Sequence, residues 1–300
     1  MIADVGAWAA ERRRPGDPVD LRDHTDEIVW AATRAPSYRN TQPWLFRVAA
    51  RQVEVYADRS RSCAMADPDD RELFLGLGAA VFGIRLAMSR LRLRPVVGLS
   101  RDHARPDLAA VVVAAGRVHV PDEDVRLYDQ LDRRRTVWTP FADVPVPVEL
   151  EVELADLIRH EGATPRWLLR VGTRRMVTEL ARRAAAERLD DPELETPGWP
   201  SAIPPPEPAP TLVAICTPGD HRADWLRAGQ ALQHVLLAAS AAGIAGSFLS
   251  PVIDVPRLRH QLRSELDLPG CPQVLLGLGR PQEPLPSASP RRPVVDVLMR

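Results

Sequence analysis

Apolar residues recur along the chain at two spacings, which predict helices mixed with short strands. The spacing is helical in residues 26–35, where Thr25 can cap the helix and Pro36 can end it. Further helices are predicted at residues 68–91, 122–132, 148–160, 173–189, 222–242 and 255–266. Strands are predicted at 44–48, 52–57, 95–99, 108–115, 166–171, 211–216, 246–249 and 273–278. Because these elements follow no strict strand–helix–strand order, we expect an α+β fold with central antiparallel sheets flanked by helices.

The pattern also contains an internal repeat. Residues 77–93 align with residues 228–244 at a constant offset of 151, so that Gly78 meets Gly229 and Ser89 meets Ser240. Alanine-rich helices match one another easily, and chance remains an alternative. The offset is half of the chain, which favours a tandem duplication with halves at residues 1–120 and 121–300.

One segment fits no regular element. Residues 190–210 contain eight prolines and almost no periodic apolar pattern, so they cannot form a helix or a central strand. The segment is either a linker or a lid that packs through Trp199 and Ile203 over a pocket. Sequence alone leaves both possibilities open.

Composition and charge exclude several classes of protein. The 39 basic residues, all arginine, nearly balance 40 acidic residues, so no whole-chain field attracts nucleic acid or anionic lipid. Such arginine, alanine and proline usage is typical of a GC-rich genome. The first residues lack a secretory apolar core, and the apolar window 231–249 is expected to be a buried helix. Three dispersed cysteines favour neither a disulfide framework nor a zinc site, and we expect a cytoplasmic protein.

The common catalytic and nucleotide-binding motifs are missing from the sequence. The Gly76–Gly78 and Gly277–Gly279 pairs lack the third glycine of a dinucleotide loop. The sequence contains no P-loop, no GxSxG and no HExxH motif. Hydrolase and metalloenzyme activities therefore lose their usual support.

A chemically unusual stretch follows the first predicted helix. Residues 35–44, APSYRNTQPW, concentrate amides, hydroxyls and aromatic rings between two prolines, and we call them the corner segment. The prolines restrict the backbone, which would hold the polar groups rigidly where a helix turns into a strand. A ligand-binding corner and a capped helix end with a buried tryptophan both fit this pattern.

The corner segment closely resembles the APSxxNxQPW motif of the nitroreductase family of FMN-dependent oxidoreductases. LDRRRTVWTPF (131–141) is similar to that family's RRSxR segment, and PRRPVVDVL (290–298) to its C-terminal Arg-x-Pro segment, both directed at the FMN phosphate. CPQVLLGLGR resembles its last core strand, and the stretch from Asp224 to Asp254 resembles the long helix and the loop beside the flavin. The resemblance covers most of residues 20–300 and implies a nitroreductase-like fold, duplicated in tandem.

The resemblance implies non-covalent FMN and one complete site. The corner segment occurs only in the first half and the phosphate segments only in the second, as in the Acg-like branch of mycobacteria and related actinobacteria. No catalytic side chain or metal ligand is expected. Arg134, Arg135 and Thr136 suit a phosphate dianion, although without the resemblance the arginine run would be interpreted as solvated surface. The implied cofactor-binding residues are Pro36, Ser37, Asn40, Gln42, Arg134, Arg135, Thr136, Leu249, Ser250, Arg291 and Arg292.

The activity implied by the resemblance is hydride transfer from NADPH or NADH, through flavin, to a small electrophilic acceptor. Storage of FMN with little turnover and a specialised biosynthetic flavin oxidase or dehydrogenase remain alternatives. The expected assembly is a monomer that acts as a pseudo-dimer, or a homodimer, with no nucleic-acid or membrane partner. Two positions depart from the pattern: Trp138 stands where the second phosphate-side arginine is expected, and Gly277 replaces an arginine of the last core strand.

Overall fold

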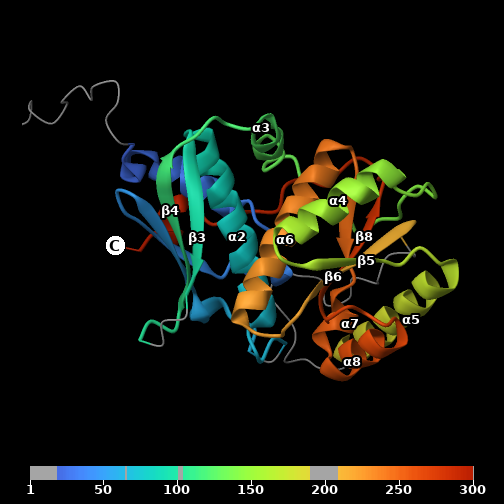
Figure 1. Ribbon diagram of the computed structural model, residues 1–300. Coiled ribbons are helices and arrows are strands. Elements are labelled where there is room, and N and C mark those ends of the chain that lie inside the picture. The colour runs from blue at the N-terminus through green and yellow to red at the C-terminus, as the bar shows by residue number, and fades with distance from the viewer. Residues whose placement is uncertain (1–18, 65, 101–103, 190–208, 300) are drawn as a thin grey trace, which may run out of the picture.

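The computed structural model describes residues 19–299, except 65, 101–103 and 190–208. Its strands are β1 (Trp44–Val48), β2 (Gln52–Ala57), β3 (Leu93–Leu99), β4 (Leu108–Arg117), β5 (Thr164–Trp167), β6 (Thr211–Thr217), β7 (Ala245–Phe248) and β8 (Cys271–Gly279). Its α-helices are α1 (Thr25–Thr33), α2 (Arg71–Arg90), α3 (Asp122–Tyr128), α4 (Val148–His160), α5 (Val171–Leu189), α6 (Arg222–Ala241), α7 (Ser250–Asp254), α8 (Pro256–Glu265) and α9 (Val294–Val297). The expected α+β class with antiparallel sheets flanked by helices is confirmed (Figure 1).

The two halves of the chain repeat one arrangement. The strand order is β1-β2-β4-β3 in the first sheet and β5-β6-β8-β7 in the second, with every neighbouring pair antiparallel. In each half, a 20-residue helix lies between the second and third strands, α2 in one and α6 in the other. The helices begin 151 residues apart, which is the offset of the sequence repeat. This repetition supports the predicted duplication, while the shared origin itself stays a prediction.

Helices α2 and α6 cross closely at the centre of the molecule (Figure 1). A Cβ atom on Gly78 would lie 2.2 Å from the carbonyl oxygen of Leu226, and one on Gly229 would lie 2.0 Å from that of Leu75. The offset of 151 relates Gly78 to Gly229 and Leu75 to Leu226. Each helix therefore uses the same patch against the other, as in an isologous two-fold interface, and glycine is what lets the backbones meet.

The two sheets differ in how they are covered. Strand β6 (TLVAICT) is buried at every residue, because α6 lies on one side and a second core with α5, α7 and α8 on the other. After the buried Leu93, strand β3 instead alternates between exposed and half-buried residues, and Val96 on β3 and Val113 on β4 remain exposed. The continuous apolar run and the alternating run thus match two-sided and one-sided burial.

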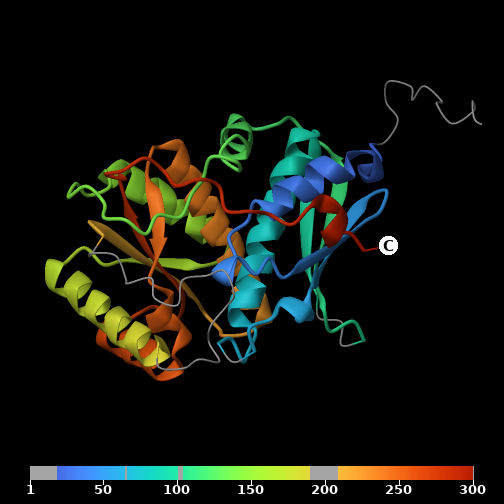
Figure 2. The same ribbon diagram turned by 180° about the vertical axis from the view of Figure 1, so that it is seen from behind.

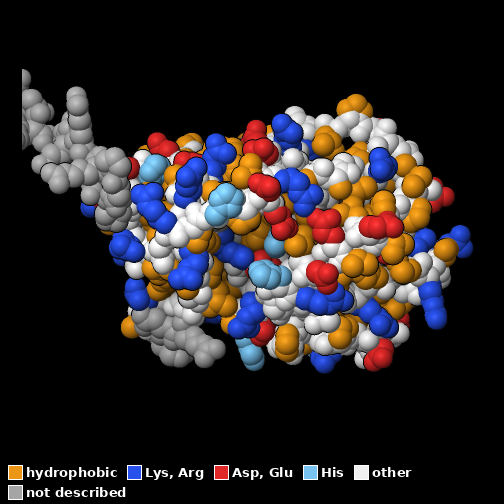
Figure 3. All heavy atoms as spheres, turned by 45° about the horizontal axis from the view of Figure 1, so that its top comes forward, with side chains coloured by type: hydrophobic (Ala, Val, Ile, Leu, Met, Phe, Trp, Pro, Cys, Tyr) orange, Lys and Arg blue, Asp and Glu red, His pale blue; other side chains and the backbone are white. Residues whose placement is uncertain are grey.

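The apolar stretches are accounted for by the core. Among the described helices, α2 is long and apolar enough to cross a membrane, but 89% of the relevant stretch is buried inside the protein. The window 231–249 was expected to form one buried helix, and this expectation was wrong. It contains the end of α6, a turn with Gly243 at φ 73°, and β7. Acidic and basic side chains share the face in Figure 3, consistent with the net charge of −1.

Several predicted boundaries were wrong. Thr25 does not cap α1: it is the first residue of that helix, because the 3₁₀ helix Leu21–His24 runs directly into it and is capped by Asp20. The strand predicted at 166–171 lies at Thr164–Trp167, since α5 begins at Val171. Helices α7 and α9 were not predicted. Apart from residues 209 and 210, the proline-rich segment 190–210, with Trp199 and Ile203, lies outside the described residues.

The C-terminal segment (residues 290–299) returns from the second half to the first (Figure 2). Leu298 pairs with Phe46 in a parallel bridge, and the backbone N–H of Met299 donates to the carbonyl oxygen of Phe46 at 2.8 Å. One continuous buried cluster also includes residues from both halves. The halves at 1–120 and 121–300 are therefore interlocked, and that division stays a prediction.

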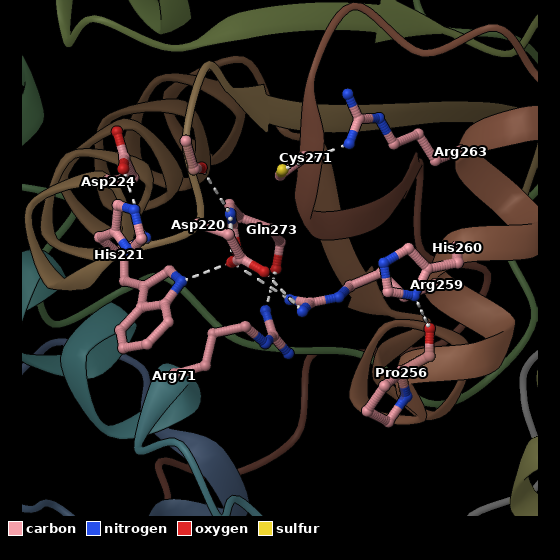
Figure 4. Close-up of polar contacts among 12 residues, drawn as sticks. Arg71, Asp220, His221, Asp224, Pro256, Arg259, His260, Arg263, Cys271 and Gln273 are labelled. Atoms are coloured by element: carbon pink, nitrogen blue, oxygen red, sulfur yellow. Dashed lines mark hydrogen bonds and ion pairs between the residues drawn. The ribbon is translucent and has the colours of Figure 1, made fainter.

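A buried polar network joins the start of α2 to the second half (Figure 4). The Arg71 guanidinium donates to the carbonyl oxygen of Gln273 at 2.6 Å, to Asp254 Oδ1 at 3.0 Å and to Glu72. Nearby, Asp220 accepts from Trp225 Nε1 at 2.7 Å and faces Arg259. These contacts tie α2 to β8 and α7.

This network makes stability depend on pH. Burial raises the pKa of Glu72 to about 8, and Asp254 and Asp67 add to the rise while Arg71 opposes it. Between the unfolded pKa, about 4.3, and about 8, the folded chain binds a proton that the unfolded chain lacks, so the free energy of unfolding falls as pH rises. Glu72→Gln is expected to flatten this decline, as measured by urea unfolding across that range.

The exposed Glu149 on α4 provides the matched control. Glu149→Gln should retain the pH dependence of the parent protein. Equal pH slopes for the two variants would show that Glu72 does not hold the proton.

Candidate cofactor site

The corner segment holds an unusual backbone conformation. Arg39, Asn40 and Gln42 have φ values of 45°, 56° and 51°, in the left-handed region that residues other than glycine rarely adopt. Ser37 stabilises the turn, because its Oγ accepts the backbone N–H of Gln42 at 3.0 Å. Such strain persists only where the surroundings impose it, and it concentrates at functional sites.

Helix α2 provides part of this support. A Cβ on Gly76 would lie 3.4 Å from Ser37 Cβ and 3.7 Å from the carbonyl oxygen of Pro36, so the helix packs directly on the corner segment. Trp44, at its end, is fully buried as the first residue of β1. The structure therefore contains the capped helix end with a buried tryptophan, and the backbone between the two is strained.

The amides of the corner segment hold the C-terminal segment. Asn40 Nδ2 donates to the carbonyl oxygen of Pro290 at 3.0 Å, and Gln42 Oε1 accepts the backbone N–H of Arg292 at 2.7 Å. In return, the Arg291 guanidinium donates to Asn40 Oδ1 at 2.9 Å. Two predicted site segments, 250 residues apart in sequence, therefore meet through hydrogen bonds of both amide side chains.

Arg291 and Arg292 have different surroundings. The Arg292 guanidinium pairs with Asp58 Oδ2 at 3.0 Å and donates to the carbonyl oxygen of Gln42 at 3.1 Å, so its charge is neutralised. The Nε of Arg291 is buried and has no hydrogen-bond partner within the described part of the chain. Arg291 therefore has a buried donor without a partner among the described residues, whereas the charge of Arg292 is paired with Asp58.

The arginine run reaches the same place from the second half. A bridge between Thr136 and Gly246 attaches the run to β7, and the Arg134 guanidinium donates to Thr136 Oγ1 at 3.3 Å. Arg134 is only 6% exposed, and its Nε is buried without a partner among the described residues. Arg135 donates to the carbonyl oxygens of Asp132 and Pro286. The arginine run is partly buried and is not a solvated surface strip.

The positive charge of this cluster exceeds the negative charge near it. Burial, together with the charges of Arg291 and Arg135, lowers the pKa of Arg134 to about 9. Burial also lowers the pKa of Arg291 to about 10, with Arg34 and Arg135 adding to the effect and Asp132 opposing it. Buried guanidinium groups with free Nε–H donors are suited to a bound anion of high charge, and they fit the phosphate dianion of FMN.

The remaining predicted residues lie on the second sheet. Leu249 lies between β7 and α7 and is buried in the core formed with α5, α7 and α8, and Ser250 begins α7. Gly277 lies beside Leu249, and a Cβ there would be 2.7 Å from Ala209 Cβ. Ala209 occupies the space that a side chain at position 277 would need, which is why this chain has glycine there.

Some contacts at the site involve residues that sequence reasoning missed: Arg34, Asp58, Asp132 and Pro290. Arg34 directly precedes the corner segment and Asp132 directly precedes the arginine run, so their positions carried a signal. Pro290 begins the C-terminal segment that was singled out, but the hydrogen bond from Asn40 to its carbonyl oxygen could not be predicted from a local pattern. The pairing of Asp58 with Arg292 is likewise a tertiary contact without a local signal.

We compared the chain with known protein families, curated relatives and solved structures. No family model matches the chain. A curated relative from Mycobacterium tuberculosis, named "Putative NAD(P)H nitroreductase Rv3131", is 29% identical over 312 aligned positions that cover 90% of each chain. Another from the same organism, "Putative NAD(P)H nitroreductase acg", is 25% identical and covers 94% of this chain and 97% of its own. A solved structure titled a putative nitroreductase from Anabaena variabilis has a TM-score of 0.58 at 11% identity, over 91% and 93% of the two chains.

The chain therefore has the nitroreductase fold, as the motifs implied. Full-length similarity to Acg and a second mycobacterial protein confirms the resemblance to the nitroreductase family and to its Acg-like branch.

Proposed function

We propose that this protein is an FMN-dependent oxidoreductase of the nitroreductase type, which uses NADPH or NADH as reductant and a small electrophilic molecule as acceptor. The observation that carries the proposal is the buried arginine cluster beside the strained corner segment, where the Nε–H donors of Arg134 and Arg291 have no partner among the residues that the structure describes. The names of the mycobacterial relatives, which specify NAD(P)H nitroreductases, support the choice of reductant.

Different residues of the chain would have different roles in binding FMN. Arg134 and Arg291 would meet the phosphate of FMN, and Thr136 and Arg135 would fix the position of the arginine run. Asn40 and Gln42 hold the C-terminal segment in place, so that Arg291 is presented to the site. When bound, FMN supplies the two-electron chemistry, accepting a hydride from the nicotinamide and passing it to the acceptor.

The site would form once per chain. The corner segment comes from the first half, whereas Arg134 and Arg291 come from residues 121–300, and both sets are needed. A monomer could therefore bind flavin without a partner, although a homodimer remains compatible with the same site.

Titration of the purified protein with FMN tests the proposal. We expect about one FMN per chain by absorption spectroscopy, because one arginine cluster meets one corner segment. Anaerobic addition of NADPH or NADH should then bleach the flavin absorbance, and an electrophilic acceptor should restore it. Failure to bind FMN, or binding of two per chain, contradicts the proposed site.

The two steps of this experiment separate binding from turnover. Stoichiometric FMN that neither nicotinamide reduces would leave the site intact and favour storage of the cofactor. Riboflavin, which lacks the phosphate, serves as the matched ligand control and should bind more weakly than FMN.

A further inference from the structure

Arg34 lies at the boundary between α1 and the corner segment. It is the residue after the last turn of α1, and its guanidinium carbon lies 5.2 Å from the centre of the Trp30 ring. Its side chain is 19% exposed, and its Nε is buried without a hydrogen-bond partner among the described residues. Stacking on the tryptophan holds the planar group in one orientation while leaving a donor unused.

The other contacts of Arg34 are weak. One terminal nitrogen lies 3.4 Å from Asp132 Oδ1, and the other lies 3.4 Å from Thr33 Oγ1. Both distances exceed those of charge-assisted hydrogen bonds, which are about 2.7–2.9 Å. Asp132 is itself 65% exposed, so this ion pair is screened by solvent and offsets little of the charge of Arg34.

Arg34 also belongs electrostatically to the buried arginine cluster. Burial lowers its pKa, and Arg135 lowers it further while Asp132 opposes both effects. Arg34 in turn lowers the pKa of Arg291. Guanidinium groups that repel one another in a partly buried site are stabilised by an anion that all of them contact.

We propose that Arg34 is an additional binding residue of this site, contributed by the first half, and that with Arg134 and Arg291 it selects a dianionic phosphate monoester. The inference rests on the proposed FMN function and adds a specificity residue that the sequence motifs do not include. It makes the phosphate pocket a joint structure of the two halves, with Arg34 on one side and the arginine run and C-terminal segment on the other.

Binding of FMN and riboflavin by matched variants tests this role. Arg34→Gln should reduce the preference for FMN over riboflavin by at least about tenfold, because a charge-assisted contact to phosphate is lost. Its affinity for riboflavin should match that of the parent, which also shows that the variant is folded. Arg159→Gln, at an exposed position on α4 that pairs with Asp156, should change neither affinity.

Asp132→Asn separates ligand binding from a structural ion pair. It removes the negative charge of Asp132 but keeps the Arg34 guanidinium, so the FMN preference should be retained or increased. A similar loss of preference in Asp132→Asn and Arg34→Gln would overturn the inference, since the ion pair alone would then explain it.

Failure of the inference can be told apart from failure of the proposed function. If the parent prefers FMN and Arg34→Gln keeps that preference, Arg34 is not a binding residue and the FMN site stands. If the parent binds both flavins equally, the phosphate site and this inference fail together. If Arg34→Gln binds neither flavin, Arg34→Met decides, because methionine carries no charge: preserved riboflavin binding with reduced FMN preference supports the role, and full FMN preference refutes it.

Discussion

Replacement of Arg134 by glutamine is expected to weaken FMN binding by at least about tenfold and to stabilise the protein without ligand. The first effect follows from loss of a charge-assisted contact to phosphate, about 1.5–3 kcal/mol. The second follows because burial lowers the pKa of Arg134 to about 9, so its charge is unfavourable until an anion binds. Fluorescence titration with FMN and thermal unfolding with and without FMN measure the two effects.

Arg292→Gln provides the contrast within the same site. Its guanidinium pairs with Asp58 and holds backbone carbonyls, so its loss should lower the stability of the protein without ligand. Opposite shifts in unfolding temperature are therefore expected for the two substitutions. If Arg134→Gln destabilises the ligand-free protein as Arg292→Gln does, Arg134 has a structural role and the anion site is wrongly assigned.

Among substitutions that add a single methyl group, Gly229→Ala is expected to cause the largest loss of stability. Its Cβ would lie 2.0 Å from the carbonyl oxygen of Leu75, so α2 and α6 would have to separate along their whole contact. Overpacking of a core costs about 1–3 kcal/mol, and the obstacle here is rigid backbone rather than a movable side chain. Urea unfolding should show a loss at the upper end of that range or beyond.

Gly172→Ala in α5 is the matched control. A Cβ at Gly172 has no atom within 4 Å, and alanine favours a helix over glycine. This substitution should leave stability unchanged or raise it slightly. Similar losses at positions 172 and 229 would contradict the close helix crossing.

Much of the fold could be predicted where one local pattern dominates. Residues 44–48, 52–57 and 148–160 were predicted with the observed boundaries, because β-branched runs and a strong helical period coincide there with clear end signals. The strand at 166–171 was misplaced because residues 167–169 are apolar, yet only Thr164–Trp167 find partners on β6. Helix α7, five residues long, is too short for a period to be recognised.

In the candidate site, too, the local motifs could be predicted from the sequence and the tertiary contacts could not. The corner segment, the arginine run and the C-terminal arginines were identified as motifs, and the structure places them around one cluster. That Arg291 keeps a free donor while Arg292 is neutralised by Asp58 could not be predicted, because adjacent arginines have identical local signals. Arg34 was missed although it directly precedes the corner segment, because its contact with Asp132 of the second half, 98 residues away, is not visible in the local sequence.

The return of the C-terminal segment to β1 has a consequence for how the protein matures. Arg291 and the residues that pair with Phe46 lie about 250 residues after the corner segment and β1, so they are synthesised long after the segment that receives them. A chain whose translation stops before residue 291 therefore lacks the contact between Arg291 and Asn40, however far its earlier parts have folded. Under the proposed function, flavin binding would then report that translation has passed the C-terminal segment.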